Sequence, residues 1–374
     1  IGQHRNVRVG DAVVRQPIYD LSCTDSRPLD DGRHRLFGVQ VALFDDGVHG
    51  AELWQTDGTA GGTRLLKDIY PGPTGSDITS MTALGGRAVF WANDGTNGVT
   101  LWVSDGTEAG THAVAGGFSP AYTIGRPIPQ LNGAVYFPAW DTAAGQELWR
   151  SDGTAAGTWR VADIDPGPAD SAPAELTPTE TRLFFTAADS ASGRELWVTD
   201  GTKSGTRRVR DIARGAGSST PAHLTMTDGG LYFAADDGVH GPELWHADAA
   251  GSDATLVKDV VPGANGCAPR EIAKLGTRVV FVGAEGTGVP SGSIASGLGE
   301  PFVSDGTAAG TFQLRDIVAG SGSDPENLTR VGNHIVFHLA HGPPGGNAFW
   351  STDGTSAGTV ALSGLPLEFN NWHT

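Results

Sequence analysis

The sequence is short of positive charge. It carries 25 Lys and Arg against 42 Asp and Glu, which gives a formal net charge of −17 at pH 7. Phosphate groups are bound by basic patches, so this balance argues against a nucleic-acid partner and, for the same reason, against anionic membrane surfaces. Cations, neutral sugars and basic proteins remain as ligand classes, and the charge alone also suits a well-solvated secreted protein.

Long apolar runs are missing as well. No run reaches the roughly 18 residues that a membrane-spanning helix requires, so we expect no membrane insertion. The chain begins at Ile1 with no visible signal peptide, as a processed, exported protein would. A chain whose start had been altered by engineering would look the same. We therefore expect a secreted or cell-surface protein.

Cysteines and catalytic signatures are also scarce. The two cysteines, Cys23 and Cys267, lack the spacing of a zinc site, and either a disulfide or two separate thiols fits their turn-rich surroundings. The chain has no Gly-x-Ser-x-Gly elbow, no Gly-x-x-x-x-Gly-Lys phosphate loop and no His-Glu-x-x-His pair. The sequence therefore gives no positive indication of an enzyme and leaves catalysis uncertain.

Glycine, in contrast, is abundant. It makes up 55 of the 374 residues, beside 22 prolines, and only 18% of the residues are charged. No long stretch shows the apolar periodicity of a helix. This composition predicts many short strands joined by tight turns.

A motif of the form Glu-Leu-Trp-x-Ser/Thr-Asp-Gly-Thr, followed three residues later by Gly-Thr, recurs along the chain. The steps are 47 or 48 residues, with one longer step of 57. A repeat of this length is a complete supersecondary unit, and seven of them nearly fill the chain. The aromatic anchors of the seven repeats are Trp54, Trp102, Trp149, Trp197, Trp245, Phe302 and Trp350.

The fourth repeat shows the pattern of one unit. Four β-rich runs, here named A to D, are separated by turn residues. Dipeptides between runs A and B, such as Asn132-Gly133 and Asp228-Gly229, suit the positive φ angles of tight hairpins. A four-stranded sheet that is apolar on both faces must pack against its neighbours, so the repeats predict an all-β fold, a seven-bladed β-propeller of antiparallel blades. The four runs cover residues 174–179, 182–187, 195–200 and 206–212.

This architecture predicts a single propeller domain over residues 1–374, with seven repeats in 31–363 and a tail in 364–374. Within the N-terminal segment 1–30, residues 11–19 resemble a D strand and are a candidate clasp that completes the last blade. The last repeat has its own candidate D strand at 358–363, so we expect one of the two to be an additional outermost strand.

The motif resembles the ELWxxDGT repeat family of bacterial proteins. Full matches occur at 52–59, 147–154 and 195–202, whereas Thr100 replaces the glutamate in the second repeat. The resemblance implies a propeller-like, usually exported protein and no particular reaction. Because the motif aspartates recur in nearly every repeat, we expect them to stabilise turns, with cation binding as the alternative. They are Asp57, Asp105, Asp152, Asp200, Asp305 and Asp353.

Function is expected where repeats depart from their common pattern, on the face that carries the B–C and D–A loops. Alignment at the start of strand A places Glu175, His223, Glu271 and Asn327 at equivalent positions in four successive repeats. Such a set can bind a divalent cation such as Ca²⁺ or act as acid and base. The alternative is that these side chains are solvated or bridge neighbouring blades. Gly32, Ser80 and Pro127 occupy the same position in the first three repeats.

Aromatic residues beside carboxylates suggest a second candidate site. Trp140 and Asp141 lie in a B–C loop, and Phe118 and Tyr122 lie in the preceding D–A connection. Exposed aromatic rings can stack on sugar rings while carboxylates bond to the hydroxyl groups. Packing of these rings in the core is the competing interpretation.

The remaining candidates are loops. The sequence Asp-Asp-Gly-Val-His-Gly occurs at 45–50 and at 236–241, where His49 and His240 can ligate a metal or take part in local turn bonding. The insertion around residues 284–299 explains the longer repeat and is either a binding loop or a neutral insertion. His334, His338 and His341 crowd the last repeat without the spacing of a helical metal site.

The leading hypothesis is therefore a secreted propeller that serves as a recognition module for a glycan or an extracellular protein. One alternative is a metal-dependent enzyme with its site at the mouth of the central channel. The other is a structural surface or matrix protein.

Overall fold

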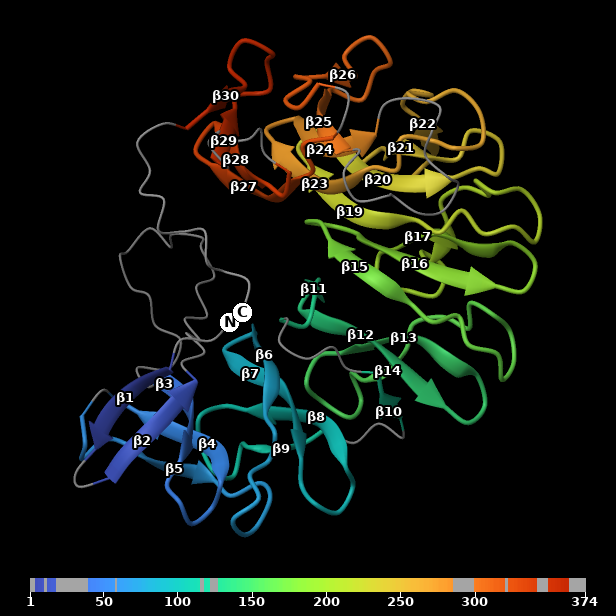
Figure 1. The fold of residues 1–374 in the computed structure, drawn as a ribbon. Helices are drawn as coiled ribbons and strands as arrows, with labels where there is room; N and C mark the ends of the chain where they lie inside the picture. Colours follow the sequence, from blue (N-terminus) through green and yellow to red (C-terminus); the bar gives the residue numbers. More distant parts are fainter. Residues whose placement is uncertain are drawn as a thin grey trace. The chain divides into compact units, whose positions relative to one another are not determined.

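The computed structural model describes residues 4–9, 12–17, 40–57, 59–114, 118–121, 127–284, 299–319, 322–341 and 349–362. All regular secondary structure in these ranges is β-strand, paired antiparallel throughout (Figure 1). The same ranges contain no helix that is long and apolar enough to cross a membrane. The chain divides into two compact units, Ile1–Pro173 and Ala174–Thr374.

The first unit contains the sheets of the first three repeats and a separate hairpin. The hairpin pairs β1 (His4–Val9) with β2 (Ala12–Pro17). The first sheet contains β3 (Gln40–Asp45), β4 (Ala51–Thr56) and β5 (Arg64–Lys67). The second contains β6 (Thr79–Leu84), β7 (Arg87–Asn93), β8 (Val99–Ser104) and β9 (His112–Ala113). The third contains β10 (Ser119–Pro120), β11 (Gln130–Leu131), β12 (Ala134–Asp141), β13 (Gly145–Ser151) and β14 (Trp159–Arg160).

The second unit contains the sheets of repeats four to seven, each with four strands in chain order. They are β15 (Ala174–Pro178), β16 (Leu183–Asp189), β17 (Gly193–Thr199) and β18 (Arg207–Arg208); β19 (Ala222–Thr227), β20 (Gly230–Asp236), β21 (Pro242–Ala247) and β22 (Ala254–Leu256); β23 (Arg270–Leu275), β24 (Arg278–Ala284), β25 (Gly299–Ser304) and β26 (Phe312–Gln313); and β27 (Pro325–Val331), β28 (His334–Leu339), β29 (Phe349–Thr352) and β30 (Val360–Ala361). These seven repeat sheets are the blades of a β-propeller, which confirms the predicted fold class.

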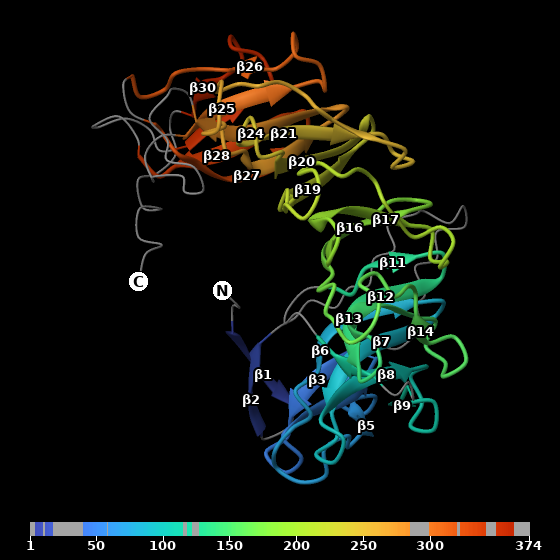
Figure 2. The same ribbon diagram turned by 90° about the vertical axis from the view of Figure 1, so that its right-hand side faces the viewer.

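Each blade buries apolar side chains on both faces. In β20, Phe233 packs against the preceding blade, whereas its neighbour Tyr232 packs against the following one. Both side chains are at most 1% exposed. This alternation is the period of a strand, and it explains why one repeat cannot be stable without the next. Within the second unit the first strands β15, β19, β23 and β27 are successive neighbours (Figure 1). Figure 2 shows β19 and β27 of this unit after a turn of 90°.

The Asp-Gly-Thr turn closes the hairpin between the third and fourth strands. Asp152 Oδ1 accepts the backbone N–H of Thr154 at 2.9 Å and its hydroxyl at 2.7 Å. Thr154 Oγ1 in turn accepts the N–H of Gly157. The motif aspartates therefore stabilise turns, as expected, and these hydrogen bonds lower the pKa of the carboxyl groups, as in Asp57. Equivalent bonds from Asp to the Thr two residues later occur at Asp57, Asp105, Asp200, Asp305 and Asp353.

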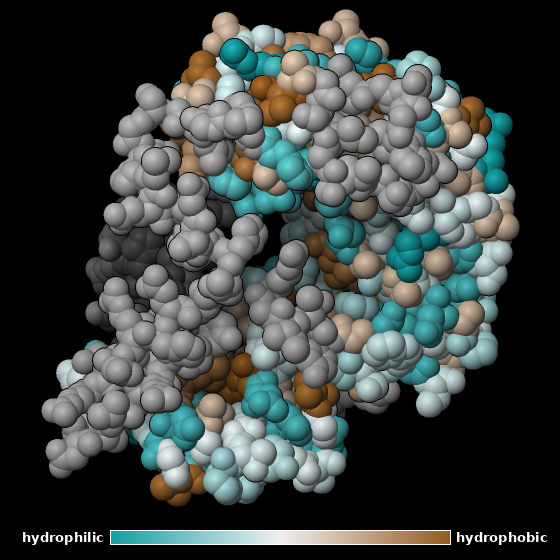
Figure 3. All heavy atoms as spheres, viewed as in Figure 1, coloured by the Kyte–Doolittle hydropathy of each residue, from teal (hydrophilic) through white to brown (hydrophobic). Residues whose placement is uncertain are grey.

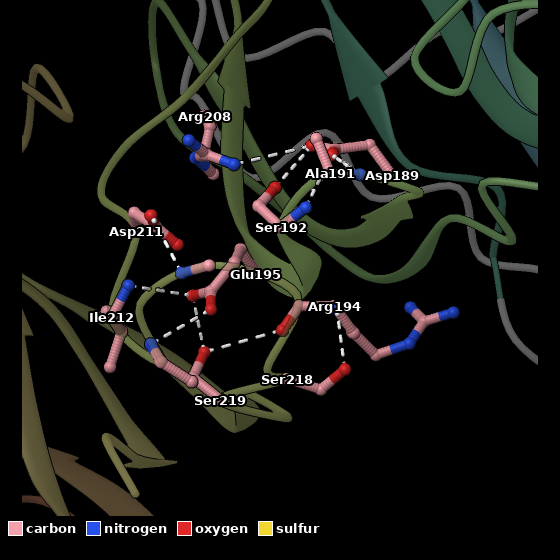
Figure 4. A network of polar contacts seen from close by, with 12 residues as sticks. Asp189, Ala191, Ser192, Arg194, Glu195, Arg208, Asp211, Ile212, Ser218 and Ser219 are labelled. Atoms are coloured by element: carbon pink, nitrogen blue, oxygen red, sulfur yellow. Dashed lines mark hydrogen bonds and ion pairs between the residues drawn. The ribbon is translucent and has the colours of Figure 1, made fainter.

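The motif glutamate clamps the connection that leads to the next blade. Glu195 accepts the N–H groups of Ile212 at 3.2 Å and Ala213 at 3.1 Å, and the hydroxyl of Ser219 at 2.5 Å (Figure 4). The same clamp recurs with Ser76, Ser171 and Ser323 as the hydroxyl donors. Burial raises the pKa of all five glutamates, and that of Glu147 to about 7. The five, each at most 4% exposed, are Glu52, Glu147, Glu195, Glu243 and Glu300.

The two hairpin turns predicted between strands A and B differ in their backbone conformation. Asn132 and Gly133 adopt positive φ angles of 50° and 71°, as a tight hairpin requires. At Asp228-Gly229, however, the positive φ falls on Gly230, because Thr227 Oγ1 holds the N–H of Gly229.

The candidate clasp strand, β2, pairs with β1, and the last blade has the D strand β30 predicted within 358–363.

Candidate functional site

The first strands of the blades begin with a β-bulge. The register of β15 against β16 shifts between Ala174 and Thr177, and β19, β23 and β27 shift at equivalent points. At each bulge one residue adopts the left-handed conformation, which is uncommon for residues other than glycine. These φ angles are 54° for Glu175, 58° for His223, 52° for Glu271 and 56° for Asn327. The structure therefore confirms that the four positions are equivalent.

We name Glu175, His223, Glu271 and Asn327 the bulge row. All four are exposed, and they lie on neighbouring first strands of the second unit. Glu175 Oε2 accepts the N–H of Leu224 at 3.4 Å, and Glu271 Oε2 accepts the N–H of Leu328 at 3.3 Å. Each glutamate thus contacts the bulge of the following blade, as the bridging interpretation expected. Within the part of the chain that the structure describes, the side chains of His223 and Asn327 make no hydrogen bond.

The bulge row is not arranged as a metal centre. In the described ranges no three His, Cys, Asp or Glu side chains are grouped so that they can hold a metal ion, and Glu175, His223 and Glu271 are accordingly not such a group. Two of the four side chains turn toward the backbone of the next blade instead. The arrangement therefore offers hydrogen-bonding groups along successive strands rather than one coordination sphere.

Beside the bulge row lies a charged network that the sequence did not indicate. Asp324 Oδ1 accepts Arg270 Nη2 at 2.6 Å and the N–H of Gly299 at 2.9 Å. Asp324 Oδ2 is 3.2 Å from His341 Nδ1, and the Asp324 side chain is only 5% exposed. Arg270 directly precedes Glu271, and Asp324 lies three residues before Asn327. The partners come from different repeats, so no local motif connects them in the sequence.

The predicted aromatic site is largely used for structure. Phe118 is partly buried and packs 5.3 Å from Phe137 and 5.2 Å from Trp149, measured between ring centroids. The structure therefore agrees with the competing interpretation for Phe118, the packing of its ring against the core. Trp140 does remain 41% exposed, with its Nε1 3.4 Å from Asp170 Oδ2.

The carboxylate of Asp141, in the same candidate site, also forms contacts within the protein. Asp141 Oδ1 accepts the N–H groups of Ala143 and Ala144, and Oδ2 pairs with Arg160 at 2.9 Å. Tyr122 lies outside the described residues. Among the described aromatic residues of this candidate site, Trp140 is exposed and Phe118 is partly buried.

In each of the two Asp-Asp-Gly-Val-His-Gly loops, the histidine bonds to an aspartate of the same loop. His49 Nδ1 lies 2.7 Å from Asp46 Oδ2, and His240 Nδ1 lies 2.8 Å from Asp237 Oδ2. The hydrogen bond to aspartate raises the pKa of both histidines. Asn97 makes the equivalent contact to Asp94 in the second blade, so the bond belongs to the turn. Local turn bonding therefore accounts for these residues.

Cys267 is a free, fully buried thiol. It occupies the place of the clamp serine in the fifth blade, where its backbone N–H bonds to Glu243 Oε1 at 3.1 Å. Burial raises the pKa of the Cys267 thiol well above its usual value. Cys23 and the greater part of the insertion, residues 285–298, lie outside the described residues.

The surface around these elements is mixed in polarity. On the face shown in Figure 3, most described residues of the second unit are hydrophilic or intermediate, and hydrophobic residues occur in small groups.

Comparison with known proteins yields likeness of fold only. No family model matches the chain, and no curated protein matches it. Similar solved structures include a puromycin hydrolase, with 16% identity, a TM-score of 0.42 and coverage of 86% of this chain and 51% of that one. A GH74 xyloglucanase from Xanthomonas campestris has 15% identity and a TM-score of 0.39, over 84% and 50% of the chains. The β-propeller domain of the Trilobed protease from Pyrococcus furiosus has 14% identity and a TM-score of 0.34, over 74% and 83%. The chain thus spans about half the length of the first two.

Proposed function

We propose that this protein is an exported recognition module that binds a glycan through the bulge row. The observation that carries the proposal is the retention of side chains at positive φ in four successive blades. Glycine adopts this conformation at no steric cost, whereas other residues are strained there. Strain of this kind concentrates at functional positions, and here it places exposed polar groups on adjacent strands.

The chemistry of the row suits sugar hydroxyl groups. The carboxylates of Glu175 and Glu271 accept hydrogen bonds, and the amide of Asn327 and the imidazole of His223 both donate and accept. Each sugar hydroxyl is likewise a donor and an acceptor. The excess of acidic residues does not oppose a neutral ligand.

The motif residues support the proposal by exclusion. The turn aspartates and clamp glutamates already bond to backbone and hydroxyl groups, so they serve the scaffold. The bulge row differs because its residue types change from blade to blade while its backbone conformation does not. Variation of side chains on a constant backbone is what a recognition surface requires.

A glycan array followed by calorimetry tests the proposal. We expect a glycan ligand whose affinity falls about tenfold in His223→Ala and in Asn327→Ala, since each loses roughly one hydrogen bond. Arg330→Ala is the control, because Arg330 lies on β27 but bonds to Gly332 at the far end of the strand. An extracellular protein that binds in place of any glycan, with the same sensitivity, would correct the ligand class. A ligand whose affinity is the same in both variants as in the wild type would contradict the assignment of the binding site to the bulge row.

A further inference from the structure

The glutamates of the bulge row show what the bulge of the following blade can bind. Glu175 Oε2 lies 3.4 Å from the backbone nitrogen of Leu224, and Glu271 Oε2 lies 3.3 Å from that of Leu328. Both contacts are exposed. In each, the N–H follows the bulge residue of one blade, and the oxygen comes from the bulge residue of the preceding blade. This N–H is therefore a surface donor that takes an acceptor oxygen.

Between these two contacts, the same donor has no glutamate in front of it. The fifth blade has His223 as its bulge residue, and the N–H that follows the bulge of the sixth blade belongs to Ile272. The register of β23 against β24 shifts between Arg270 and Ala273, so Ile272 has no paired residue on β24. No side chain of the described residues accepts its N–H. The N–H of Ile272 is therefore left for solvent or for a ligand.

The backbone around Ile272 matches that of the neighbouring blades. The φ angle of the residue before it, Glu271, is 52°, against 54–58° at the other three bulge residues. Thr225 Oγ1, two residues after His223 on β19, donates to the C=O of Ile272 at 2.9 Å, so the two first strands are in contact here. Ile272 is partly exposed, as are the residues whose N–H groups meet the two glutamates. Equal geometry thus places the N–H of Ile272 beside His223.

The surroundings of this donor select the kind of acceptor. Glu271 is next to Ile272 in the chain, and the whole protein has a net charge of −17, so a carboxylate of a ligand is repelled here. A neutral carbonyl oxygen accepts the same bond without that repulsion. Glu271 Oε2 contacts Leu328, whereas Oε1 has no hydrogen bond within the described structure and is able to accept one. A donor and an acceptor on neighbouring residues match the C=O and the N–H of an amide group.

We infer that the N–H of Ile272 and the carboxylate of Glu271 form a subsite for an acetamido group, which makes the ligand a glycan that contains an N-acetylated sugar. The inference rests on the proposed glycan-binding function and names the class of sugar. The C=O of the acetamido group accepts the N–H of Ile272, and its N–H donates to Glu271 Oε1. The hydroxyl groups of the sugar bond to His223 and Asn327.

Pairs of ligands that differ in the acetamido group test the subsite. Chitotriose is paired with cellotriose, and N-acetylgalactosamine with galactose, since the first of each pair has an acetamido group where the second has a hydroxyl group. All four are titrated into the full chain by calorimetry. We expect at least one N-acetylated ligand to bind about tenfold more tightly than its counterpart, because the subsite adds roughly one net hydrogen bond. That ligand should also slow hydrogen exchange of the Ile272 N–H, measured by NMR.

His223→Glu is the most informative variant, because it installs the glutamate that the fourth and sixth blades carry. The new carboxylate should bond to the N–H of Ile272, slow its exchange without any ligand, and abolish the preference for the acetamido group. His223→Ala leaves the N–H open, so it should bind both members of a pair more weakly and keep the preference. Thr255→Glu is the matched control. It adds the same charge at an exposed position of the outermost strand β22 and should change neither affinity nor exchange.

The outcomes separate the subsite from the wider proposal. Glycans that bind with sensitivity to His223→Ala, while neither N-acetylated ligand is preferred, would overturn the acetamido subsite and leave the glycan module intact. A preference that survives in His223→Glu, although the exchange of the Ile272 N–H has slowed, would also overturn it. Unchanged exchange in His223→Glu would show that this N–H does not face position 223, which removes the geometric basis of the inference. Failure of every glycan to bind would instead contradict the proposed function.

Discussion

The carboxylate of Asp57 lies directly against the Cα of Gly62, so that a Cβ at residue 62 would overlap it. Asp57 is held there by the N–H and hydroxyl of Thr59. The same contact recurs in the other Asp-Gly-Thr turns, which explains why a glycine follows each of them at a fixed distance.

Gly62→Ala is therefore expected to destabilise the first unit by about 1–3 kcal/mol, because the new methyl group displaces Asp57 from its turn. Gly61→Ala is the control in the same turn, since nothing lies within 4 Å of its Cβ position. We expect that variant to change the free energy of unfolding by less than roughly 0.5 kcal/mol. Urea denaturation measures both, and equal effects at the two glycines would contradict the steric explanation.

The buried glutamates predict a pH dependence of stability. Burial raises the pKa of Glu147 to about 7 from an ordinary value of 4.5, so the folded state holds the proton more tightly than the unfolded chain. The stabilisation is complete below the unfolded pKa and is lost as the pH rises through about 7. It amounts to roughly 3 kcal/mol, at about 1.4 kcal/mol per pKa unit.

Glu147→Gln removes this ionisation and should lose that part of the pH dependence. The free-energy difference between the wild type and Glu147→Gln is expected to be largest below pH 4.5 in favour of the wild type, and to shrink as the pH rises through about 7. Denaturation curves at several pH values provide the measurement. A difference that stays constant over this range would show that Glu147 titrates alike in both states.

Replacement of Cys267 by serine is expected to stabilise the protein. In four other blades a serine hydroxyl donates to the clamp glutamate, whereas Glu243 Oε2 is buried without a strong donor. Cys267→Ser should supply that bond and raise the free energy of unfolding by about 0.5–1.5 kcal/mol. Cys267→Ala has no hydroxyl and should show no gain in thermal or urea denaturation. A gain in the alanine variant would mean that relief of packing, not the bond, is responsible.

The repeat predicted more of this structure than of its function. The fixed spacing identified the strands, and the alignment placed Glu175, His223, Glu271 and Asn327 at one position, where the structure shows one backbone conformation. The sequence analysis did not identify the bond between Glu195 and Ser219, although a serine follows the motif glutamate by 24 residues in three blades and by 23 in the sixth. The Arg270–Asp324–His341 network gave no such signal, because it occurs once and joins residues from different blades. The sequence left open whether the Phe118 ring is exposed or packed against the core, because an aromatic residue in a loop looks the same in sequence in both cases.

The measurement that most directly tests the central claim uses the double variant His223→Gly/Asn327→Gly. Both residues have positive φ, so glycine relieves backbone strain while it removes the side chains. We predict a free energy of unfolding equal to that of the wild type or up to about 1 kcal/mol higher, together with at least a tenfold loss of affinity for the glycan identified on the array. A variant that binds as tightly as the wild type would contradict the claim that these strained side chains are retained for recognition.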